Sequence, residues 1–233
     1  MKKLLPFLFL VSCSPKEVEE YNFGQCLDVS NTSIFKKAEA HEISRRSQLK
    51  IVSFHSNGGM GHGTGTYLTY KDESYIITAA HVIRDADFSG VIFNKEIYWV
   101  EPLVVFTDRD IAILRVATIP KKQSVDLKKV KVAKKIEIGD RLVYTGYPNL
   151  TGPLTIFGTV AGHSDKTSII LQSYAWGGAS GSLILNEKGE LVGILSGIEL
   201  AHTESGKVEN ETIVIADIIP QELRDILDHV NTN

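Results

Sequence analysis

The chain has 233 residues, of which 43% are hydrophobic and 23% charged, and its formal net charge is −3. A chain of this size and composition can bury a full hydrophobic core, and its weak negative charge argues against nucleic acid as a partner. It contains two cysteines, Cys13 and Cys26, so no disulfide can staple any part of the chain beyond residue 26.

The first residues have the pattern of an export signal. Two lysines precede an apolar run at 4–11, which is too short to span a bilayer as a helix. The sequence Leu-Val-Ser-Cys that ends at Cys13 resembles a bacterial lipobox, in which this cysteine is lipidated and becomes the mature N-terminus. We therefore predict a signal peptide at 1–12 and an exported lipoprotein, anchored to a membrane and facing the periplasm or the cell exterior. A plain secretory signal and an uncleaved stub are the alternatives.

The next segment, residues 13–45, mixes both charges without a strong hydrophobic period, which predicts a tether with a short helix around 33–43. Beyond it, short runs of β-branched and aromatic residues recur at roughly the 8–12-residue spacing of all-β barrels and sandwiches. They form two sets of six, which predict an N-terminal barrel at 46–125 and a C-terminal barrel at 126–217. The expected strands lie at 51–54, 64–70, 75–78, 91–93, 97–106, 111–116, 141–147, 154–161, 168–172, 182–185, 191–195 and 212–215.

The chain closes with a predicted helix at 218–233. Four apolar residues between 223 and 230 fall on one helical face, and Pro220 suits a first helical turn. The predicted fold class is therefore all-β with a C-terminal α-helix.

Three residues could carry acyl-transfer chemistry, although each has an ordinary structural explanation. His81 ends an apolar strand, Asp110 heads another, and Ser180 lies in a Gly-Ala-Ser-Gly-Ser turn at 178–182. A lone histidine there is more often structural, and a lone aspartate often caps a turn. Together they supply a hydroxyl, a base to take its proton, and a carboxylate to orient the base. The glycine-rich turn adds backbone N–H groups for a developing oxyanion.

The motifs around these residues resemble the chymotrypsin/trypsin-fold serine peptidases, and within them the bacterial HtrA/DegP-like branch, without a PDZ domain. Thr-Ala-Ala-His ends at His81, Gly-Ala-Ser-Gly surrounds Ser180, and Asp110 lies between them in the family's order. Five further segments resemble family elements, and they lie at 63–66, 139–141, 146–148, 158–160 and 191–194.

The resemblance implies a chymotrypsin-like fold of two six-stranded antiparallel Greek-key barrels, and a serine endopeptidase that cuts unfolded or flexible polypeptides. It implies Ser180 as the nucleophile, His81 as the general acid and base, and Asp110 as the orienting carboxylate, with Asp108 as its rival. The backbone N–H groups of Gly178 and Ser180 would form the oxyanion hole.

The resemblance also implies a substrate-binding strand at Ser196, Gly197 and Ile198, with the Ser196 hydroxyl supporting Asp110. Tyr174 occupies the position at which trypsin-like members carry an acid on the pocket floor. We therefore expect a small or medium apolar side chain before the cleaved bond, rather than lysine or arginine.

Ala179 stands where the family commonly has Asn or Asp, which predicts a reshaped oxyanion loop. Two alternatives to the endopeptidase follow: a peptidase-fold binding module whose loop rests in an inactive form, and an esterase-like acyl hydrolase with the same triad. The expected partners are a polypeptide substrate and, through Cys13, a membrane. We expect no nucleic acid, metal ion or cofactor, and the sequence leaves a homo-oligomer open.

Overall fold

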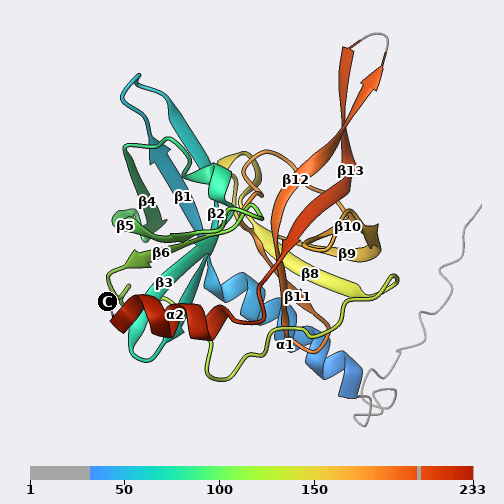
Figure 1. Ribbon diagram of the computed structural model, residues 1–233, viewed down its shortest axis with the longest axis horizontal. Helices are drawn as coiled ribbons and strands as arrows, with labels where there is room; N and C mark the ends of the chain where they lie inside the picture. The colour runs from blue at the N-terminus through green and yellow to red at the C-terminus, as the bar shows by residue number, and fades with distance from the viewer. Residues whose placement is uncertain (1–31, 204–205, 233) are drawn as a thin grey trace, which may run out of the picture. The chain divides into compact units, whose positions relative to one another are not determined.

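The structure, a computed structural model, describes residues 32–203 and 206–232. The predicted signal peptide at 1–12, the lipidation site Cys13 and the tether up to residue 31 lie outside the described residues. The described strands form two antiparallel barrels, with a helix at each end of the described chain (Figure 1). The predicted all-β class with two six-stranded barrels and a C-terminal helix is confirmed.

In the described part of the chain, the first barrel contains six strands in the order β1-β4-β5-β6-β3-β2, and pairing of β1 with β2 closes it. A short strand, β7 (Val125–Asp126), runs parallel to β2. Turns with two left-handed residues at 71–72 and 94–95 close two of its hairpins, as the type I′ geometry requires. The six strands are β1 (Gln48–Phe54), β2 (Met60–Tyr70), β3 (Glu73–Thr78), β4 (Phe88–Phe93), β5 (Glu96–Val105) and β6 (Ala112–Val116).

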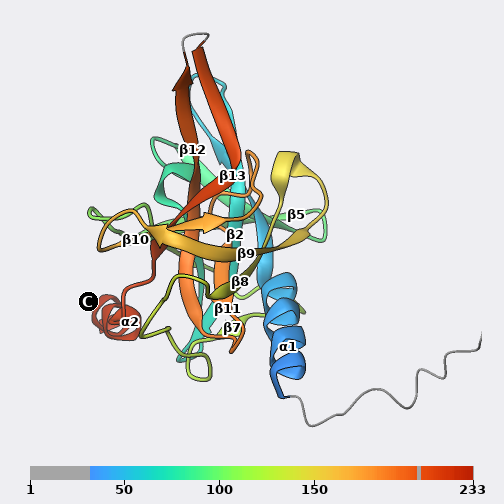
Figure 2. The same cartoon turned by 90° about the vertical axis from the view of Figure 1, so that its right-hand side faces the viewer.

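The second barrel is closed in the order β10-β13-β12-β11-β8-β9. Strands β12 and β13 form a long hairpin that projects beyond the barrel (Figure 2). The sequence predicted shorter strands here, at 191–195 and 212–215. The predicted part of β12 is buried throughout, and Val214 is buried in the predicted part of β13, which is expected because a hydrophobic pattern reveals strand segments that face a core. The strands are β8 (Arg141–Gly146), β9 (Leu154–His163), β10 (Ser168–Gln172), β11 (Leu183–Asn186), β12 (Leu191–Thr203) and β13 (Gly206–Ile218).

Part of the predicted tether is a helix packed on the second barrel. Helix α1 (Thr32–Ser47) buries Ala40 and Ser44 completely, and the Ser44 hydroxyl donates to Oγ1 of Thr145 in β8 at 3.0 Å. The predicted tether over 13–45 therefore contains a helix from residue 32 onward, which is longer than the short helix predicted around 33–43. Its fully buried residues are small or polar, and Ile43 is only partly buried against the core, so the helix carries no strong apolar period that the sequence could reveal.

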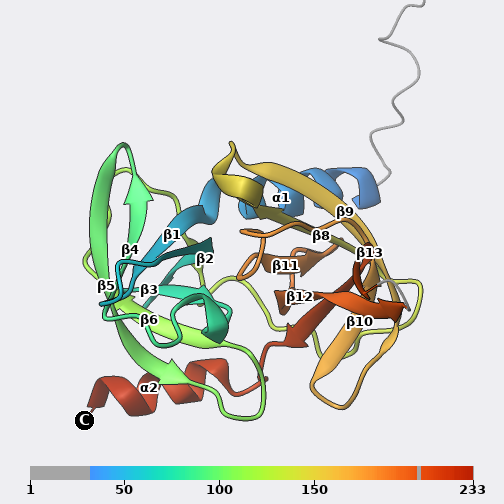
Figure 3. The same cartoon turned by 90° about the horizontal axis from the view of Figure 1, so that it is seen from above.

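The C-terminal helix returns to the first barrel. Helix α2 (Leu223–Thr232) buries Leu223 and Leu227 and bonds to strand residues through Asp228 and Asn231. Figure 3 shows α2 beside the first barrel and α1 beside β8 and β9 of the second. No helix among the described residues is long and apolar enough to cross a membrane.

One apolar core joins the two barrels. Leu183, Leu185 and Ile194 of the second barrel belong to the same buried cluster as Ile51, Ile76 and the other core residues of the first. This packing positions the strand ends that carry the candidate catalytic residues, because close-packed interiors allow little relative movement.

Candidate active site

The histidine and the aspartate meet at the ends of two paired strands. His81 lies in a one-turn helix, η1 (Ala80–Val82), just after β3, and Asp110 lies just before β6, which pairs with β3. The aspartate accepts from the backbone N–H of His81 at 2.8 Å and from its Nδ1 at 2.5 Å. Since Nδ1 donates to the carboxylate, Nε2 is the ring nitrogen left to accept a proton.

Electrostatics keeps this carboxylate ionised. Burial alone would raise the pKa of Asp110, but the hydrogen bonds from the ring and backbone N–H of His81, together with the nearby charge of Arg84, hold that pKa below its usual value. The rival Asp108 instead binds the guanidinium of Arg109, with its closest contact at 2.5 Å. Of the two acids considered from the sequence, the structure places Asp110 on the imidazole.

Strand β2 brings the serine turn against the histidine turn. The Thr64 N–H donates to the carbonyl of Ser180 at 2.8 Å. A Cβ added to Gly63 would lie within 2.7 Å of the Val82 methyl groups and 3.2 Å from the Ser180 carbonyl oxygen. Val82 directly follows His81, so this glycine permits the close approach of the two turns.

The residues before Ser180 form a type II turn. The Ala179 N–H donates to the Trp176 carbonyl at 2.9 Å, and Gly178, at the third position, has a φ of +96°. A Cβ at Gly178 would lie 2.7 Å from the carbonyl oxygen of Tyr147 and 2.9 Å from Nε2 of His62. Both the left-handed backbone and the lack of space therefore require glycine here.

Every carbonyl group from 176 to 180 accepts a hydrogen bond. The Gly177 carbonyl accepts from the Asn149 N–H at 2.8 Å, and the Gly178 carbonyl accepts from the Thr64 hydroxyl at 2.7 Å. The Ala179 carbonyl accepts from both the N–H and the hydroxyl of Ser182, at 3.1 and 2.6 Å. The Trp176 and Ser180 carbonyls accept from the Ala179 and Thr64 N–H groups described above.

These anchors determine where two N–H groups point. In a planar trans peptide the C=O and N–H point in opposite directions. The Gly178 N–H therefore points away from Asn149, and the Ser180 N–H away from Ser182. Within the described residues neither N–H donates to a protein acceptor, although buried N–H groups rarely lack a partner. This pair is the donor set that an oxyanion needs.

The expected substrate-binding residues lie beside this turn. Tyr174 is 40% exposed, and its ring packs edge-on against Trp176 at a centroid distance of 4.3 Å. Its carbonyl accepts from the Tyr144 hydroxyl at 2.6 Å, and burial raises the pKa of Tyr144 to about 12, which keeps that donor protonated.

The Ser196 hydroxyl, which is expected to support the aspartate, has another partner in the structure. This hydroxyl donates to the Ile215 carbonyl at 3.1 Å, at a bulge in the pairing of β12 with β13 between Leu195 and Gly197. One hydroxyl hydrogen cannot also support Asp110. A Cβ at Gly197 would meet no atom within 4 Å, and the backbone bonds of β12 to the β11 side end at Leu195, which pairs with Gly181 and Ser182, so the backbone beyond Leu195 has an open side.

Three supports of the serine turn were not recognised from the sequence. Thr64 and Asn149 lie in or next to glycine-containing segments that resemble the family. Their hydrogen bonds to the turn could not be predicted, because both residues are far from it in the sequence. Asn149 has a φ of +49°, a conformation that asparagine tolerates better than most residues. The residue type itself was therefore the one signal that the sequence offered. Ser182 lies in the same Gly-Ala-Ser-Gly-Ser turn as Ser180, where nothing in its residue type marks it as a support.

The double barrel and the His–Asp pair beside a serine turn define a chymotrypsin-like peptidase site. The family model of the trypsin-like peptidase domain matches residues 63–194, which is more than half of the chain. The chain belongs to this family and is a trypsin-like serine endopeptidase. No curated protein sequence matches it significantly.

Solved structures share the fold at low sequence identity. The active form of the Rv3671c protease from M. tuberculosis has a TM-score of 0.62 at 15% identity, covering 81% of this chain and 82% of that one. The serine endoprotease from Yersinia pestis has a TM-score of 0.63 at 20% identity, with 84% and 67% covered. The HtrA-type protease AlgW with a tripeptide has a TM-score of 0.66 at 17% identity, with 84% and 64% covered. The predicted resemblance to HtrA-type peptidases is confirmed at the level of the fold.

Proposed function

We propose that this serine protease hydrolyses peptide bonds in unfolded or flexible polypeptides, with Ser180 as nucleophile, His81 as general acid and base, and Asp110 as orienting carboxylate. The Ser180 hydroxyl attacks the carbonyl carbon while its proton passes to Nε2 of His81. The imidazolium then gives that proton to the leaving amine, and an acyl group remains on the serine. Water completes the hydrolysis, with His81 again accepting the proton.

The observation that carries this proposal is the anchoring of five successive carbonyls around the serine. It supports an oxyanion hole, formed by the Gly178 and Ser180 N–H groups, that is already open at rest. Preorganised donors of this kind need no rearrangement when charge develops. The open turn argues against the binding module with an idle triad, whose inactivity would require the Gly178 N–H to be turned away.

The open side of the strand at Ser196, Gly197 and Ile198 supports pairing with an extended substrate backbone. The aromatic pair of Tyr174 and Trp176 leaves no acid at the position expected for the floor of the pocket. We therefore keep the proposal of a small or medium apolar side chain before the cleaved bond.

A fluorophosphonate serine probe and a casein digest test the proposal on the wild type and on Ser180→Ala. We expect the wild type to be labelled and to cleave casein, and both activities to disappear in the variant. Ser164→Ala, which removes an exposed hydroxyl in the turn between β9 and β10, is the matched control and should behave as wild type. An unlabelled wild type would contradict the triad, and ester turnover without peptide cleavage would favour the acyl hydrolase.

We also propose export and membrane anchoring through Cys13, based on the lipobox-like sequence alone. Incorporation of radiolabelled palmitate should be lost in Cys13→Ala and retained in Cys26→Ala. Labelling that persists in Cys13→Ala would overturn this proposal.

A further inference from the structure

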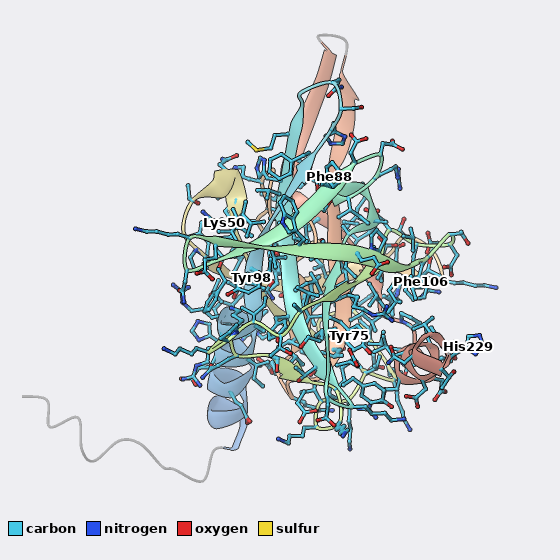
Figure 4. All side chains as sticks on the ribbon, turned by 90° about the vertical axis from the view of Figure 1, so that its left-hand side faces the viewer. Lys50, Tyr75, Phe88, Tyr98, Phe106 and His229 are labelled. Atoms are coloured by element: carbon cyan, nitrogen blue, oxygen red, sulfur yellow. The ribbon has the colours of Figure 1, made fainter. Side chains whose placement is uncertain are left out.

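Four strands of the first barrel present an exposed apolar surface, which we call the aromatic face: Phe54, Met60, Phe88, Ile97 and Trp99. Phe54 of β1 pairs with Met60 of β2 on one side and with Phe88 of β4 on the other. The exposed fractions are 62% for Met60, 68% for Phe88, 43% for Ile97 and 59% for Trp99. Figure 4 views this side of the barrel, with Phe88 near its upper end.

The side chains of this face are ordered by packing against one another. The Trp99 ring lies 6.1 Å from the Phe54 ring and 6.4 Å from the Phe88 ring, centre to centre. Gly90 pairs with Trp99, and a Cβ there would overlap Ile97 and approach the indole at 3.4 Å. Outward positions of an antiparallel barrel are usually polar, and contiguous exposed apolar side chains commonly mark an interaction site.

The aromatic face is continuous with the histidine turn. The Ser53 hydroxyl, one residue before Phe54, donates to the Val82 carbonyl at 2.7 Å and lies 3.0 Å from the Ser89 hydroxyl. The Asp87 N–H donates to the Phe54 carbonyl at 2.9 Å. Ser53 is adjacent to Phe54, and Val82 is adjacent to His81. The hydrogen bond between Ser53 and Val82 therefore connects the aromatic face to the turn that carries the candidate base.

We propose that the aromatic face is a docking surface for apolar segments of the polypeptide substrate, outside the residues that flank the cleaved bond. This inference rests on the proposed function. Unfolded chains expose the apolar side chains that folded proteins bury. A second contact on the same molecule raises the effective concentration of the cleavable segment.

Charge at the edge of the face favours a polypeptide over a membrane. Asp87 precedes Phe88, and Glu101 follows Val100, the partner of Ser89, so two carboxylates lie at the Phe88 end, while the exposed Lys95 at the Ile97 end stands next to Glu96. Surfaces that bind anionic lipid carry basic residues beside the apolar ones instead.

Binding is best measured in the Ser180→Ala background, because the readout then does not depend on turnover. The probe is fluorescein-labelled α-lactalbumin, reduced and carbamidomethylated so that it stays unfolded, and anisotropy reports its Kd. Phe88→Ser with Trp99→Ser should raise the Kd about tenfold, or about 1.4 kcal/mol. Met60→Ser, at the hairpin end of the face, should raise it two- to threefold.

The matched control is Ile138→Ser with Leu154→Ser, which removes apolar side chains that are 70% and 43% exposed outside the aromatic face. It should leave the Kd unchanged. In the Ser180 enzyme, the Phe88 and Trp99 variant should cleave a short chromogenic peptide at the wild-type rate. A loss of that activity would show damage to the site or the fold and would overturn the proposal.

Equal binding by all variants would also overturn it. Vesicle binding or dimer formation that the Phe88 and Trp99 substitutions abolish would assign the face to lipid or to a second copy instead. If the wild type cleaves no polypeptide but the Kd differences are found, the proposed function fails and the docking surface stands. If casein is cleaved and no Kd changes, only the docking surface fails.

Discussion

The two halves of the active site are held in different ways. The histidine half is local: His81 and Asp110 lie just beyond the ends of two paired strands of one barrel, and one carboxylate binds both the ring and the backbone N–H of His81. The serine half is held from a distance, by Thr64 of the other barrel and by the backbone of Asn149. Substitutions in the histidine half should therefore remove a chemical group that takes part in the reaction. Substitutions in the serine half should instead reorient a peptide group and its N–H.

The largest effect is expected in the histidine half. Asp110→Asn should lower kcat by about 10⁴-fold, since the amide would stabilise the wrong tautomer of the imidazole. Asp108→Asn should retain most of the activity, because that carboxylate binds Arg109 and not His81. Steady-state kinetics on a peptide substrate measures both, and the reverse order would overturn the assignment of the carboxylate.

In the serine half, two adjacent glycines should respond differently. Gly178→Ala introduces a Cβ at a left-handed φ and 2.7 Å from the Tyr147 carbonyl oxygen, so the turn must change. We expect kcat to fall by about 10²–10³-fold, the cost of one oxyanion donor. Gly177→Ala meets no atom within 4 Å and should remain active. Equal activity of the two variants would contradict the described turn.

The support from Asn149 should matter through its backbone. Asn149→Val disfavours the left-handed conformation by about 1–2 kcal/mol, which we expect to lower kcat about tenfold with little change in KM. Asn149→Gly keeps the conformation and the N–H, and should stay close to wild type. A fully active Asn149→Val would show that this contact does not hold the turn.

The smallest effect concerns stability in acid. Because the folded-state pKa of Asp110 is lowered, its ionised form stabilises the protein above the unfolded pKa of about 3.9. This contribution is lost as the pH falls through the folded-state pKa. The difference in unfolding free energy between wild type and Asp110→Asn should therefore shrink below about pH 3.9. A difference that stays constant from pH 6 to pH 2 would contradict the lowered pKa.

The sequence predicted most of the strands and candidate catalytic residues, because these leave a hydrophobic pattern or a motif. Buried β-branched runs indicated two sets of six strands, and His81, Asp110 and Ser180 stood in motifs of a recognisable order. Helix α1 is longer than the short helix predicted around 33–43, because its fully buried residues, such as Ala40 and Ser44, are small or polar and give no strong apolar period.

The sequence could not predict contacts that depend on backbone direction. The Ser196 hydroxyl binds Ile215 because a bulge displaces β12, and no residue type marks that bulge. Likewise, Asn149 supports the serine turn with its N–H, a group that all residues except proline possess.

A crystal structure of the wild-type protein without ligand would show whether the oxyanion hole is open at rest. We predict the Gly177 carbonyl oxygen within hydrogen-bond distance of the Asn149 nitrogen, with the Gly178 N–H directed to the Ser180 side. A Gly177 carbonyl turned into the site, with the Gly178 N–H turned out of it, would contradict an oxyanion hole that is open at rest.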